Sequence, residues 1–175
     1  MSSKSPLVCG LVLAIGLIAL LSPYRHHPTS LPQDAQSLIK RADTIQLFSL
    51  DPYTRDNLAD RSKFDEHEIS ATKFHGYIIY GSHEYTDDSS KNQIRKAIMD
   101  STPAIEIAPA SCFWPRHGLR FTAGSEYLDL LICFECNSMN TYSAAGDGSV
   151  PVTSGGKAVL SWMLMAEGIR IEPGG

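Results

Sequence analysis

Three cysteines in the second half of the chain are the residues whose spacing most directly suggests chemistry. Cys133 and Cys136 form a C-x-x-C pair, and Cys112 lies upstream of them. Such a pair exchanges disulfides when its first cysteine begins a helix, because the helix dipole and free N–H groups lower the thiol pKa. Here both cysteines lie in an apolar run typical of a strand, where their Cα atoms would be about 10 Å apart, beyond the roughly 7 Å that a disulfide spans. The spacing therefore disfavours a thioredoxin-like motif.

A structural disulfide from Cys112 to either Cys133 or Cys136 is the alternative, since exported domains commonly carry such bonds. Either pairing leaves one thiol free. If the free thiol is Cys133, the neighbouring Arg116 would favour its thiolate, and a catalytic role for Cys133 or His117 with Arg116 becomes conceivable. The competing interpretation is a small, half-buried cysteine that only packs in a sheet.

The same segment contains the ligand types of a zinc site, namely Cys112, His117, Cys133 and Cys136. Structural zinc sites place a C-x-x-C pair on a tight turn assisted by glycine, and the sequence Cys-Phe-Glu-Cys contains no glycine. The sequence therefore predicts neither a bound metal nor another cofactor, and a metal-binding module remains an alternative.

A predicted hairpin positions several of these residues. Gly124-Ser125 suits a two-residue turn, and in the resulting register Arg120 lies opposite Asp129. Apolar residues then meet on one face and opposite charges on the other, so the register is self-consistent. The charged face is the first candidate for contact with a partner, through Trp114, Arg116, Arg120, Asp129 and Glu135. The alternative is a solvated sheet face whose ion pairs are satisfied.

The wider pattern predicts a single α+β domain over residues 43–172, preceded by a linker and short helix over 25–42. Strand-like stretches lie at 44–50, 73–80, 105–122 with an interruption at 115–118, and 127–136. They predict an antiparallel sheet of about four strands. Helical patterns at 35–41, 88–102 and 157–167 predict two or three helices packed on one face of it. The Gly- and Ser-rich residues 143–156 are typical of a loop.

Residues 1–24 have the character of a transmembrane signal anchor. Leu7 to Ser22 contains no charged residue, and the stretch from Pro6 to Tyr24 would form a helix of about 28 Å, close to the hydrocarbon thickness of a bilayer. No pair of small residues in the spacing that signal peptidase requires ends the run, which favours an uncleaved anchor. We therefore expect a single-pass protein of the bacterial inner membrane with its domain in the periplasm. Secretion after signal cleavage is the alternative.

Two segments around the cysteines, Cys112–Arg120 and Leu131–Cys136, resemble an uncharacterised family of bacterial exported or membrane-anchored proteins. The shared signature is Cys-Phe-x-Pro-Arg-His-Gly followed by Ile-Cys-Phe-Glu-Cys. The resemblance implies a common fold and export, and it implies no activity and no catalytic residue.

Charge and composition narrow the function classes further. The chain has 175 residues, of which 15 are basic and 19 acidic, with a net charge of −4. Without a dense stripe of Lys and Arg it is a poor candidate for nucleic-acid binding, which depends on neutralising phosphates. The sequence thus predicts a membrane-anchored extracytoplasmic domain that binds an unknown protein partner or scaffolds the cell envelope. A small enzyme is the competing hypothesis.

Overall fold

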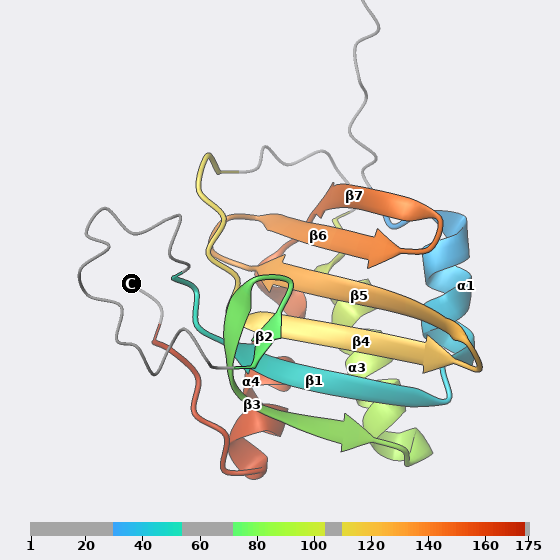
Figure 1. Ribbon diagram of the computed structural model, residues 1–175, viewed down its shortest axis with the longest axis horizontal. Coiled ribbons are helices and arrows are strands. Elements are labelled where there is room, and N and C mark those ends of the chain that lie inside the picture. The colour runs from blue at the N-terminus through green and yellow to red at the C-terminus, as the bar shows by residue number, and fades with distance from the viewer. Residues whose placement is uncertain (1–29, 54–71, 104–109, 174–175) are drawn as a thin grey trace, which may run out of the picture.

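The computed structural model describes residues 30–53, 72–103 and 110–173, and these form an α+β domain around one antiparallel sheet (Figure 1). The sheet has seven strands in the order β2-β3-β1-β4-β5-β6-β7. Their bounds are β1 Thr44–Leu50, β2 Lys73–Phe74, β3 Tyr77–Tyr85, β4 His117–Ala123, β5 Glu126–Cys133, β6 Ser138–Ser143 and β7 Gly146–Pro151. The helices are α1 Gln33–Arg41, α3 Asp88–Ser101 and α4 Lys157–Ala166, the last preceded by the short 3-10 helix η2 Ser154–Gly156.

The prediction of about four strands was wrong, because the described residues form seven. Two of the additional strands come from polar sequence. Strand β6 lies where the sequence predicted no element, and β7 lies within residues 143–156, which were expected to form a loop. They pair through their backbones over six residue pairs, from Ser138 with Pro151 to Ser143 with Gly146. A further difference is that the predicted strand at 73–80 is divided by a turn into β2 and β3.

None of the helices in the described ranges has the length or the apolar stretch needed to cross a membrane. The predicted anchor over residues 1–24 lies outside those ranges. The predicted strand start at 105–109 also lies outside them, and residues 110–116 form no strand.

The predicted hairpin register is confirmed. β4 and β5 pair with Leu119 opposite Leu130, Phe121 opposite Leu128 and Arg120 opposite Asp129. Gly124, at the first turn position, has a φ of 59°, in the left-handed region that glycine adopts without a steric cost. The hairpin therefore fixes which side chains of β4 and β5 share a face.

The main core lies between the sheet and the helices, which in Figure 1 lie behind the sheet or, for α1, at its hairpin end. Each helix contributes buried apolar residues, among them Ile39 of α1, Ile98 of α3 and Leu164 of α4. They meet strand residues of one parity, such as Leu119 and Leu130. Helix packing on one face of the sheet thus agrees with the sequence pattern.

The opposite sheet face, which we call the open face, carries a second and smaller apolar cluster of Phe48, Leu50, Phe74 and Leu131. Phe74 reaches it because the β2–β3 hairpin folds over the sheet, in front of β1 and β4 in Figure 1. A Cβ atom at Gly118 of β4 would lie 2.9 Å from the Phe74 ring. Glycine at this position therefore leaves the space that the hairpin occupies.

Candidate functional site

A row of polar side chains crosses the open face at right angles to the strands. The strand registers pair Gln46 with Arg120, Arg120 with Asp129, and Asp129 with Tyr142. Since directly paired residues of an antiparallel sheet point to the same face, these four side chains stand next to one another on β1, β4, β5 and β6.

Asp129 lies at the centre of this row and is fully buried, with 0% of its surface exposed. Arg120 donates two hydrogen bonds to it, from Nε to Oδ1 at 2.8 Å and from Nη2 to Oδ2 at 2.7 Å. This fork geometry is the strongest ion pair that two side chains form. The hydrogen bond from Arg120 to Asp129 raises the pKa of the guanidinium. The two hydrogen bonds from Arg120 thus offset the free-energy cost of burying the Asp129 carboxylate.

His75 completes the site from the β2–β3 hairpin. Its Nε2 lies 2.8 Å from Asp129 Oδ2, so the carboxylate has a partner on each side. The ring stacks on Tyr142 with centroids 3.9 Å apart and meets the edge of Phe74 at 4.7 Å. These contacts cover Asp129 and shield it from solvent.

Backbone geometry at the hairpin turn places His75 over the sheet. His75 has a φ of 48° and Gly76 a φ of 88°, so both central residues of the turn are left-handed, as a type I′ turn requires. The sequence pattern assigned no role to His75, so its contact with Asp129 was missed. The signal that was present is the dipeptide His-Gly between two strand-like runs.

Aromatic rings surround the Arg120 side chain, which remains 44% exposed. Its guanidinium carbon lies 5.4 Å from the Tyr127 ring centroid and 5.5 Å from that of Phe74. A cation held over aromatic faces gains further electrostatic stabilisation. Tyr127 is itself 43% exposed, so the arginine and the tyrosine form a rigid surface patch with Asp129 beneath it.

Three other predicted contact residues do not belong to this patch. Arg116 is buried, and its Nη1 lies 3.3 Å from Glu135 Oε2, while Lys157 Nζ of α4 lies 2.6 Å from Glu135 Oε1. Partial burial opposes ionisation of Glu135, but the hydrogen bond from Lys157 and the charges of Lys157 and Arg116 hold its pKa below the usual value. Trp114 is exposed beside Tyr53, with ring centroids 6.0 Å apart.

The expectation that Arg116 and Glu135 share one face with Arg120 and Asp129 was therefore wrong. Strand β5 ends at Cys133, so the alternation of side chains does not continue to Glu135. Glu135 joins Arg116 and the N-terminal residue of α4 instead. Among the described residues, Arg116 Nε is a buried nitrogen without a hydrogen-bond partner.

His117 lies on the helix side of the sheet and is almost completely buried. Its Nε2 lies 3.0 Å from the hydroxyl of Ser161 on α4, and Phe134 packs edge-on against its ring at 5.4 Å. Burial lowers its pKa to about 4, which Glu135 opposes. His117 is thus a neutral core residue, which does not support the hypothesis of a catalytic histidine with access to a substrate.

The cysteines are bonded differently from either predicted pairing. Cys133 and Cys136 form a disulfide with Cα atoms 5.1 Å apart, and Cys112 is free and exposed. The estimate of about 10 Å assumed a continuous strand. The strand instead ends at Cys133 and a turn follows, in which Cys136 N–H donates to Cys133 O at 3.2 Å. Cys133 is therefore not a free nucleophile.

The zinc hypothesis loses two of its four ligands to this disulfide. Within the described ranges, no group of three or more His, Cys, Asp or Glu residues is placed to hold a metal ion.

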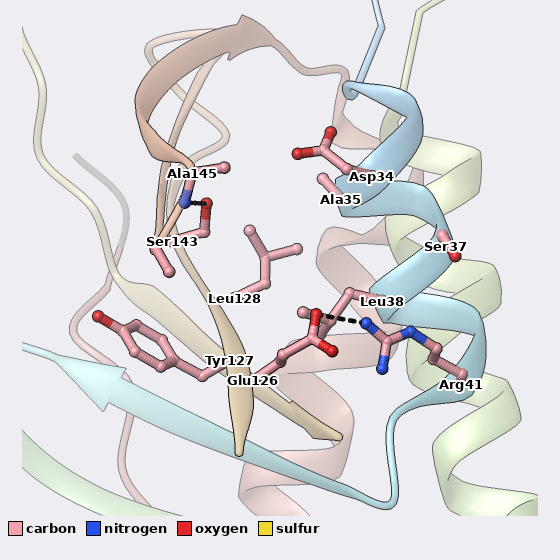
Figure 2. Close-up of a pocket in the computed structure, with 11 residues that line it drawn as sticks. Asp34, Ala35, Ser37, Leu38, Arg41, Glu126, Tyr127, Leu128, Ser143 and Ala145 are labelled. Atoms are coloured by element: carbon pink, nitrogen blue, oxygen red, sulfur yellow. Dashed lines mark hydrogen bonds and ion pairs between the residues drawn. The ribbon is translucent and has the colours of Figure 1, made fainter. Parts of the chain in front are cut away.

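A hollow of about 210 Å³ lies between α1 and the end of the sheet where β5 begins and β6 ends (Figure 2). Arg41 and Glu126 form an ion pair of 2.6 Å at one end of it. Leu128 and Ala145 form part of the wall between the helix and the sheet. Apart from Asp34, the charged side chains that line the hollow are Arg41 and Glu126, which pair with each other, and the hollow brings together no nucleophile and base.

No family model, curated protein or solved structure matches this chain. The resemblance to an exported family accordingly remains a prediction, and the function is inferred from geometry.

Proposed function

We propose that this domain is a protein-binding module of the extracytoplasmic side of the membrane and that it engages its partner through the open face. The observation that carries the proposal is the fully buried Asp129, which holds Arg120 and His75 at the same time. Burying a carboxylate is costly unless its geometry with its partners is good. Here the carboxylate fixes the Arg120 side chain between the buried ring of Phe74 and the exposed ring of Tyr127.

The composition of the patch fits protein recognition. Arginine, tyrosine and tryptophan are the residue types that most often carry the free energy of binding at protein interfaces. Arg120 and Tyr127 already hold defined positions in the free domain, so binding would cost little side-chain entropy. The partner expected from this chemistry presents carboxylate or carbonyl oxygens to the exposed side of Arg120 and an apolar group to Tyr127.

The compartment is inferred from two features. The disulfide between Cys133 and Cys136 is typical of an oxidising environment outside the cytoplasm. The uncharged run from Leu7 to Ser22, which lies outside the described residues, supports an anchor in the bacterial inner membrane or, as the alternative, a cleaved leader of a secreted domain.

Capture of partners from detergent-solubilised membranes tests the proposal. The full chain, a chain without residues 1–24 and the variants Tyr127→Ala and Trp162→Ala are used as bait. Trp162 is the matched control, because it is 58% exposed on α4, on the helix side of the sheet. The expected result is a partner retained by wild type and Trp162→Ala and lost with Tyr127→Ala. Retention by Tyr127→Ala together with loss by Trp162→Ala would overturn the proposal.

Arg120→Lys provides a second test of the same surface. Lysine keeps the charge but cannot form the fork with Asp129 or stack between two rings. We expect it to weaken capture even when the domain remains folded by circular dichroism.

A further inference from the structure

The free thiol of Cys112 lies against the disulfide. Its Sγ is 3.9 Å from Cys136 Sγ, although the two residues are 24 positions apart. This separation is little more than the roughly 3–3.5 Å at which reacting atoms are considered close to attack.

Main-chain contacts on both sides of Cys112 hold it there. Ala110 N–H donates to Cys136 O at 2.9 Å, and Trp114 N–H donates to Cys136 Sγ at 3.4 Å. The backbone on both sides of Cys112 is thus fixed along the turn that carries the disulfide, which keeps the Cys112 side chain within reach of Cys136.

Access to the three sulfur atoms is unequal. Cys133 and Cys136 are 0% and 1% exposed, whereas Cys112 is exposed. A thiol in solution therefore cannot reach the disulfide directly, and Cys112 is the sulfur of this cluster through which exchange can begin.

A backbone hydrogen bond is in place to stabilise the sulfur atom that would leave. Cys136 N–H donates a hydrogen bond of 3.2 Å to Cys133 Sγ. Such a bond strengthens when the acceptor becomes an anion, so it would stabilise a Cys133 thiolate. Disulfide exchange is faster when the departing thiolate is stabilised.

We propose that Cys112, Cys133 and Cys136 form a thiol–disulfide exchange site with two alternative bonds that share Cys136. Cys112 gives its proton to water, and the resulting thiolate attacks Cys136 Sγ. The Cys112–Cys136 bond forms as the Cys133–Cys136 bond breaks, the electron pair leaves on Cys133 Sγ, and that thiolate takes a proton from water. One disulfide and one thiol are present before and after, so the step needs no oxidant or reductant.

This inference is independent of the proposed binding function. In one bonding state the free thiol is the exposed Cys112, and in the other it is the buried Cys133. Only in the second state does a covalent bond join the segment before Trp114 to the β5–β6 turn.

Mapping of the bonds in the full-length wild-type protein tests the proposal. The purified chain is held at pH 8, then unfolded in an acidic denaturant that contains N-ethylmaleimide, and digested without reduction at acid pH. Linked and alkylated peptides are identified by mass spectrometry. We expect a Cys112–Cys136 linked peptide together with alkylated Cys133, in addition to the Cys133–Cys136 peptide with alkylated Cys112. A map without the Cys112–Cys136 link overturns the proposal.

Two variants identify the attacking thiol. Cys112→Ser should reduce alkylation of Cys133 to background, because the bond then has no internal nucleophile. Cys9→Ser, which removes the fourth cysteine of the sequence, should leave the wild-type pattern unchanged. Persistent alkylation of Cys133 in Cys112→Ser would show that exchange does not pass through Cys112 and would also overturn the proposal.

Discussion

Arg120 holds Asp129 through two parallel hydrogen bonds of 2.8 and 2.7 Å, with the carboxylate fully buried and the guanidinium half exposed. The two residues are direct partners in the β4–β5 ladder, so the backbone register and the side-chain fork support each other. Because Asp129 is buried and Arg120 is half exposed, removing the arginine and removing the carboxylate should change the free energy of unfolding by different amounts.

Removing the arginine should cost more stability than removing the carboxylate. Arg120→Ala leaves the buried Asp129 carboxylate with His75 as its remaining partner. We expect the free energy of unfolding to fall by an amount near the lower end of about 3–5 kcal/mol. Asp129→Asn leaves a guanidinium that water can reach, and we expect about 1–3 kcal/mol. Urea unfolding of the purified chain in mild detergent measures both.

Arg41→Ala is the control for this comparison, since Arg41 and Glu126 form an ion pair whose two side chains are exposed. It should lower the free energy of unfolding by less than about 1 kcal/mol. Equal losses of unfolding free energy in Arg120→Ala and Arg41→Ala would show that burial does not increase the contribution of the Arg120–Asp129 ion pair to stability.

Gly118→Ala should displace the β2–β3 hairpin. The new methyl group would lie 2.9 Å from the Phe74 ring, and overpacking of this kind costs about 1–3 kcal/mol. The smaller side chain in Gly118→Ala/Phe74→Leu should recover part of the loss. If the double variant is no more stable than Gly118→Ala alone, contact with Phe74 is not the cause.

The buried His117 predicts a loss of stability in acid. Its pKa is about 4 in the folded protein and about 6.5 in the unfolded chain, so folding favours the neutral ring. The free energy of unfolding is unaffected by this group above about pH 6.5 and falls as the pH is lowered toward 4. At pH 4 the loss amounts to about 3 kcal/mol. Urea unfolding at a series of pH values between 7.5 and 4 measures this dependence.

His117→Asn serves as the control, because asparagine does not titrate in this range. It should be less stable than wild type at pH 7.5, and its stability should change less between pH 6.5 and 4. An equally steep dependence in wild type and variant would assign the effect to other groups.

The hairpin of β4 and β5 was predictable because its signals are local. Gly124 marks the turn, and the alternation of apolar and charged residues on both sides fixes one register. Arg120 and Asp129 could therefore be paired before the structure was known. Their common partner could not, because His75 is 54 residues from Asp129 and reaches it only through the fold of the hairpin over the sheet.

The strands β6 and β7 were missed for a different reason. Their sequences, SMNTYS and GDGSVP, contain few apolar residues, so the hydrophobic pattern indicates no strand in either. Strand β6 pairs with β5, and β7 pairs with β6, along continuous registers, and this pairing supplies the order that their composition does not. The end of β5 at Cys133 was hidden in the same way, since the apolar sequence continues through Phe134 into the turn.

Site-specific photo-crosslinking in intact cells tests the central claim, that the open face is the surface that binds a partner. A benzophenone amino acid is placed at position 127 on the open face or, as the matched position, at 162 on α4. We predict a covalent adduct of one defined mass from Tyr127→benzoylphenylalanine and none of that mass from Trp162→benzoylphenylalanine. Adducts from position 162 alone, or from neither position, would contradict the account.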